Sequence, residues 1–71
     1  MDIPKYIRLC LAQKEISEAE LAARLNTTRQ NLNLKMKRHS LRESDLEEIA
    51  DALGATVSLK FIDKATGKPI I

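Results

Sequence analysis

The chain has 71 residues and a formal net charge of +2, enough for one domain in which roughly 60% of the unfolded surface becomes buried. Hydrophobic residues make up 44% and charged residues 31%, and only Tyr6 and Phe61 are aromatic, which argues against disorder and favours a helical bundle. Cys10 and His39 are each the single residue of their kind, so we expect no internal disulfide, metal, cofactor, small-molecule substrate or enzyme activity.

The first two helices are predicted from apolar spacing and capping residues. Ile3, Ile7 and Leu11 recur every four residues, which predicts a helix over 3–14 with Cys10 packed on the same face. Ser17 and Glu20 have the spacing of a capping box, in which each side chain accepts a backbone N–H. A second helix therefore begins at Ser17 and directs Leu21 and Leu25 inward.

The third and fourth helices follow a short turn and a basic linker. Asn26 tolerates the left-handed backbone of a tight turn, and Thr28 can cap a helix that runs to about Lys37. Leu32 and Met36 form its apolar stripe. A fourth helix is predicted over 43–53, with Leu46, Ile49, Ala50 and Leu53 facing the core and Gly54 as its left-handed stop.

After Gly54 the apolar period changes to two, which predicts a half-buried strand over Val57–Phe61. Gly67 can close a turn, and residues 68–71 can form a short return strand that Pro69 limits to an edge. The predicted fold is mainly α: a four-helix helix-turn-helix bundle over 1–54 with a C-terminal β-hairpin over 55–71.

Positive charge is concentrated in the middle of the chain. From residue 24 to residue 42 there are six basic residues and no acid, namely Arg24, Arg29, Lys35, Lys37, Arg38 and Arg42. The next 11 residues carry five acids and no base. A basic block without acids favours an anionic partner, of which nucleic acid is the commonest.

Two short helices joined by a tight turn, the second rich in polar and basic residues, are typical of a helix-turn-helix. Ala22 is where these helices would cross most closely. Arg29, Gln30 and Asn33 would then face a major groove, where Arg pairs with guanine and Gln or Asn with adenine, and Leu34 is a further candidate beside them. The residues expected to hold phosphates are Thr28, Lys35, Lys37 and Arg38.

Residues 17–32 (SEAELAARLNTTRQNL) and 46–54 (LEEIADALG) resemble the phage Cro and repressor-like helix-turn-helix family, of the xenobiotic-response-element type. The similarity covers residues 3–54. It implies a bacterial or phage transcription regulator that binds double-stranded DNA as a homodimer. The bundle-core positions that it implies are Leu21, Ala22, Leu32, Ile49, Ala50 and Leu53, and the DNA-facing positions are Thr28, Arg29, Gln30 and Asn33.

One recognition helix covers a half-site, so we expect a homodimer. The strand Val57–Phe61 is the candidate for joining two copies through its open edge; the alternative is that the hairpin folds back over the first and fourth helices. With no apolar run near the roughly 20 residues of a membrane span and no secretory signal, a cytoplasmic location is expected. A second possible function is a protein-interaction module, such as an antitoxin or adaptor, built on the same bundle.

Overall fold

The computed structural model describes residues 2–38 and 40–71, and this part of the chain forms helices and no strand. The helices are α1 (Ile3–Lys14), α2 (Glu18–Arg24), α3 (Arg29–Lys37) and α4 (Glu43–Ala52). The prediction of a mainly helical bundle is therefore confirmed. His39, which stands alone in the sequence, lies outside the described residues.

Each of the first three helices begins with a side chain that accepts a backbone N–H of the first turn. The three acceptor and donor pairs, each at 3.1 Å, are Asp2 with Lys5, Ser17 with Glu20, and Thr28 with Asn31. The reciprocal half of the capping box predicted at Ser17 is wrong, because the Glu20 carboxylate instead accepts from Arg24 at 3.0 Å. A reciprocal bond of that kind occurs at α4, where the backbone N–H of Arg42 donates to Asp45 at 2.9 Å.

Left-handed residues end two elements at the positions that the sequence predicts. Asn26 has a φ of 58° in the turn between α2 and α3, and Gly54 has a φ of 69° just after α4. Asn and Gly adopt this conformation at less cost than other residues. The chain therefore reverses at points fixed by local chemistry.

The core lies where α1, α2, α3 and α4 meet. Leu21 and Met36 are fully buried, and Ala22 is only 1% exposed, which fits its predicted place at the close approach of α2 and α3. The core also contains the buried residues Ile7, Leu11, Leu32, Ile49, Ala50 and Leu53. Ile3, Cys10, Leu25 and Leu46 are partly buried against this cluster.

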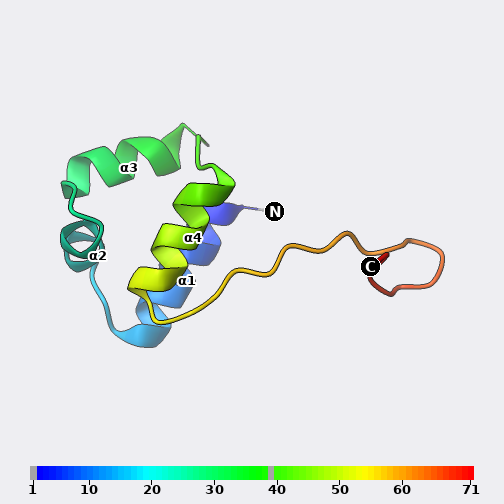
Figure 1. The fold of residues 1–71 in the computed structure, drawn as a ribbon. Helices are drawn as coiled ribbons and strands as arrows, with labels where there is room; N and C mark the ends of the chain where they lie inside the picture. Colours follow the sequence, from blue (N-terminus) through cyan, green and yellow to red (C-terminus); the bar gives the residue numbers. More distant parts are fainter. Residues whose placement is uncertain (1, 39) are drawn as a thin grey trace.

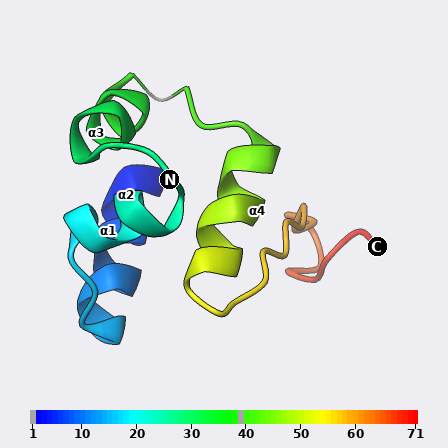
Figure 2. The ribbon, with the colours of Figure 1, turned by 60° about the vertical axis from the view of Figure 1, so that its left-hand side comes forward.

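The segment after Gly54, which we call the tail (residues 55–71), differs from its prediction. It leaves the end of α4 and runs away from the helices, as two views show (Figures 1 and 2). The predicted strand Val57–Phe61 and its return strand are wrong: one antiparallel bridge joins Ile62 and Pro69, and Phe61 is 85% exposed. The period-two pattern exists, but no strand among the described residues pairs with it, and Val57, Leu59 and Phe61 stay 37%, 66% and 85% exposed.

Among residues 2–38 and 40–71, no helix is long and apolar enough to cross a membrane.

Candidate nucleic-acid interface

The face of α3 that points away from the core carries five side chains, which we call the outer face: Arg29, Gln30, Asn33, Leu34 and Lys37. Residues four apart on a helix are neighbours, so 29, 33 and 37 form one row and 30 and 34 the next. Leu32 and Met36 of the same helix are buried and anchor it in the core. The structure thus brings the three predicted base-reading residues onto one surface.

The N-terminus of α3 opens onto solvent beside Thr28. The Thr28 hydroxyl accepts from the amide of Asn31, and the Thr28 carbonyl accepts from that of Leu32 at 3.0 Å. Among the described hydrogen bonds, none uses the amides of Arg29 and Gln30, as is usual for the first turn of a helix. These amides and the positive end of the helix dipole suit a bound phosphate.

Asn33 is the least exposed of the three base-reading candidates, and it is contacted from α1. Its side-chain oxygen accepts from the Arg8 guanidinium at 3.5 Å, a long hydrogen bond, and Arg8 also pairs with Glu18 at 2.8 Å. Arg8 therefore links α1, the start of α2 and the outer face of α3. Sequence reasoning missed Arg8, since its partners lie 10 and 25 residues away and no local pattern marks them.

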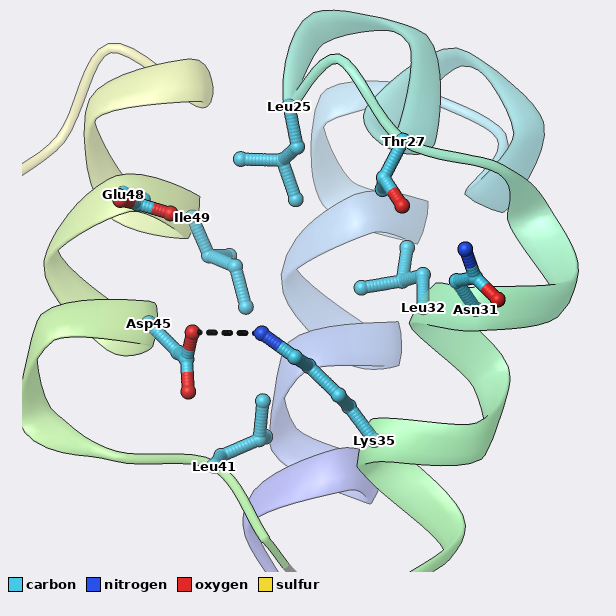
Figure 3. Close-up of a pocket in the computed structure, with 9 residues that line it drawn as sticks. All are labelled: Leu25, Thr27, Asn31, Leu32, Lys35, Leu41, Asp45, Glu48 and Ile49. Atoms are coloured by element: carbon cyan, nitrogen blue, oxygen red, sulfur yellow. Dashed lines mark hydrogen bonds and ion pairs between the residues drawn. The ribbon is translucent and has the colours of Figure 1, made fainter.

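Lys35 lies on a different side of α3 from the outer face. Its ammonium pairs with Asp45 of α4 at 3.0 Å, across a small pocket of about 90 Å³ between α3 and α4 (Figure 3). Leu25, Leu32 and Ile49 line the apolar part of this pocket. Of the four predicted phosphate-binding residues, Lys35 is thus already engaged with an acid inside the fold.

Asp45 is held ionised by its position at the start of α4. The backbone N–H of Arg42 is the larger cause and the Lys35 ammonium the next, and together they lower the pKa of the Asp45 carboxyl below its ordinary value. The side chain of Asp45 is 17% exposed, against 57% for Lys35. The pair fastens the N-terminus of α4 to α3.

The basic block divides into residues that maintain the fold and residues that stay on the surface. Arg24 donates to the carbonyl of Ala52 at 2.9 Å, which satisfies a free carbonyl at the end of α4. For Arg29, Lys37 and Arg38, no ion pair occurs among residues 2–38 and 40–71. These three cations lie on or directly after α3, so the positive charge gathers at one helix.

Within the described part of the chain, no group of three or more His, Cys, Asp or Glu side chains could hold a metal ion. What the surface of α3 offers is hydrogen-bond donors and acceptors in a row, flanked by cations. Such a surface can bind a polyanion and contact base edges.

Comparison of the chain with family models, curated proteins and solved structures found no match.

Proposed function

We propose that this protein is a sequence-specific DNA-binding regulator of transcription that inserts α3 into the major groove. The observation that carries the proposal is the outer face of α3, where Arg29, Gln30 and Asn33 project from a helix anchored by buried Leu32 and Met36. The order of α2, a short turn and α3 supports this proposal, because the second helix of a helix-turn-helix is the one that reads bases.

The base-reading roles follow from side-chain chemistry. Arg29 can donate two hydrogen bonds to guanine O6 and N7, and Gln30 or Asn33 can pair with adenine N6 and N7. The Asn33 side-chain oxygen accepts from Arg8 at 3.5 Å, and its NH2 group can donate to a base acceptor. Leu34, 43% exposed beside these residues, adds an apolar surface suited to a thymine methyl group.

The phosphate-binding roles belong to residues around the two ends of α3. Thr28 and the free amides of the first turn serve one phosphate, while Lys37 and Arg38 serve others near the C-terminal end. Lys35 was predicted for the same task, but its ion pair with Asp45 directs it toward α4. We therefore expect Lys35 to contribute less to DNA affinity than Lys37.

The proposed regulator acts as a homodimer, since one recognition helix covers only a half-site and two copies must lie about 34–36 Å apart along the duplex. The tail is the element proposed to join the copies. It projects on the side of the molecule away from α3 (Figures 1 and 2), so pairing through it leaves both outer faces free.

A protein-interaction module on the same bundle is the second candidate function, and the exposed apolar side chains of the tail are the observation that favours it. Leu59, Phe61 and Ile70 are 66%, 85% and 65% exposed. Such a module would bind its protein partner equally well after Arg29→Ala and Gln30→Ala. Sequence-specific DNA binding requires both side chains.

Selection from a random duplex pool by the full chain tests the proposal. We expect enrichment of one sequence with two related half-sites, and loss of that enrichment for the double variant Arg29→Ala with Gln30→Ala. Both side chains are exposed, so the variant should keep its helical circular dichroism. Enrichment of no sequence by the wild-type chain would contradict the proposal and favour the interaction module.

A further inference from the structure

An apolar groove of about 430 Å³ runs between α1 and α4. Ile3, Tyr6 and Cys10 line it from α1, and Leu46 and Leu53 line it from α4. Its size falls within the roughly 300–1,000 Å³ of sites that bury most of a small ligand, so it can take a cluster of apolar side chains. In the described chain only the first residues of the tail, 55–59, lie along it.

The end of the tail carries an apolar cluster of matching character. The amide of Ile70 donates to the carbonyl of Phe61 at 2.9 Å, and Ile62 bridges to Pro69, so these residues are held together. The turn between them is fixed by Gly67, with a φ of 70°, and by an Asp63 side chain that accepts from the amide of Ala65 at 2.8 Å. We call Phe61 and Ile70, which the hydrogen bond between them and the neighbouring bridge place opposite each other, the tail cluster.

The tail cluster is not directed into the groove of its own chain. Residues 55–59 follow the groove and then continue outward, which places residues 60–71 beyond the helices (Figure 1). To return, the chain would have to reverse between 56 and 62, where the sequence TVSLKFI has neither glycine nor proline and contains residues that favour extended backbone. A groove and its apolar counterpart therefore exist on one chain but at separate places.

Charge is also complementary between the two surfaces. Glu43, Glu47 and Asp51 are exposed and recur every four residues on α4, in the row next to Ala50, which lines the groove. The tail carries Lys60, Lys64 and Lys68 against one acid, Asp63. A tail lying in the groove would bring basic residues near this acidic row.

We infer that two copies of this chain exchange tails, with the tail cluster of each seated in the α1–α4 groove of the other. Such an exchange is two-fold symmetric, so every contact is made twice and both apolar grooves are covered. A Phe side chain alone buries about 150–250 Å². The exchange rests on the homodimer of the proposed function and specifies its interface. The contacts within this interface involve no DNA.

Sedimentation of full-length protein without DNA tests the exchange. We expect the wild-type chain to dimerise. Phe61→Ser should raise the dissociation constant of the dimer at least about tenfold, as loss of a central aromatic side chain does. Leu34→Ser is the matched control, since it removes an exposed leucine from the outer face of α3 and should leave dimerisation unchanged. A wild-type chain that stays monomeric, or a Phe61→Ser variant that dimerises as well as wild type, would overturn the inference.

A mixed-label experiment separates exchange from other modes of pairing. A nitroxide is attached to the cysteine of Ala65→Cys in a chain that also carries Cys10→Ser. This chain is mixed with wild-type chain that is enriched in 15N and carries no nitroxide. We expect broadening of the wild-type amide signals of Tyr6, Cys10 and Leu46, which lie in the groove. Wild-type groove signals that stay sharp in the mixture, or broadening at α3 instead of the groove, would overturn the exchange.

These readouts are independent of nucleic acid. A chain that dimerises but enriches no DNA sequence would support the exchange and contradict the DNA-binding proposal. A chain that stays monomeric but enriches a sequence would contradict the exchange and support DNA binding.

Discussion

The bundle (residues 3–53) and the tail are both rich in apolar side chains, yet they bury them to very different extents. In the bundle, Leu21 is fully buried and Met36 is 1% exposed; in the tail, Leu59 is 66% and Phe61 85% exposed. Helical spacing places apolar residues on faces that meet within one chain, whereas Leu59 and Phe61 of the alternating segment stay largely exposed. A periodic pattern thus specifies a face, and burial requires a second element to cover it.

The largest effect expected from this difference is on stability. Leu21→Ala should lower the free energy of unfolding by about 2.7–5 kcal/mol, since it removes packed atoms and leaves a cavity. Leu59→Ala should change it by less than about 0.5 kcal/mol, because Leu59 packs against little in its own chain. Urea denaturation at sub-micromolar protein, where association contributes least, measures both values. Equal losses would contradict the contrast between bundle and tail.

A smaller effect is expected from two glycines with the same backbone conformation. Gly54 has a φ of 69° and Gly67 a φ of 70°, and an added Cβ at either would meet no atom within 4 Å, so only the left-handed backbone resists substitution. Gly54→Ala should cost about 1–2 kcal/mol of unfolding free energy, because this residue ends α4.

Gly67→Ala is the control within the tail. Its strain falls on a turn that supports no helix, so the unfolding free energy of the bundle should stay the same within about 0.5 kcal/mol. A Gly67→Ala loss as large as that of Gly54→Ala would show that the tail folds cooperatively with the bundle.

The smallest effect concerns acid. Asp45 has a lowered pKa, so its ionised form stabilises the folded state; this contribution is complete above the ordinary Asp value of about 3.9 and is lost as pH falls through the lower folded pKa. Asp45→Asn should cost only about 0.2–1 kcal/mol at pH 7, given that Lys35 is more than half exposed. Below about pH 4 its stability should fall less steeply than that of wild type.

Asp63→Asn, in the tail, is the matched control for that pH series, since the turn that Asp63 supports lies apart from the bundle. We expect its unfolding free energy to follow the wild-type curve between pH 2 and pH 7. An Asp45→Asn curve that also matches wild type throughout would show that the pair with Lys35 and the bond from Arg42 do not stabilise the fold.

The helices could be predicted from the sequence because their signals are local. Thr28 caps α3, and Asn26 and Gly54 take the left-handed backbone, each at the predicted position. The outer face of α3 was predictable for the same reason, since Leu32 and Met36 determine which side of the helix is buried. Spacing along the chain was sufficient for these features.

The contacts that orient the candidate site could not be predicted, because they join residues far apart in sequence. Arg8 contacts Asn33 25 residues away, and Lys35 pairs with Asp45 on another helix. The strand prediction for the tail was wrong for a related reason. The alternating pattern indicates which side chains share a face, but not whether the chain contains a surface that covers them. Both failures concern tertiary contacts, which no local pattern encodes.

The most direct test of the proposed role of α3 compares Arg29→Ala with Lys37→Ala on the selected duplex and on a random one, over a series of salt concentrations. We expect Arg29→Ala to lose about 1–3 kcal/mol on the selected duplex and much less on the random one. Lys37→Ala should weaken binding to both duplexes alike. It should also reduce the slope of log affinity against log salt concentration by about one. If both variants lose the same affinity on both duplexes, the division of α3 into base-reading and phosphate-binding residues is contradicted.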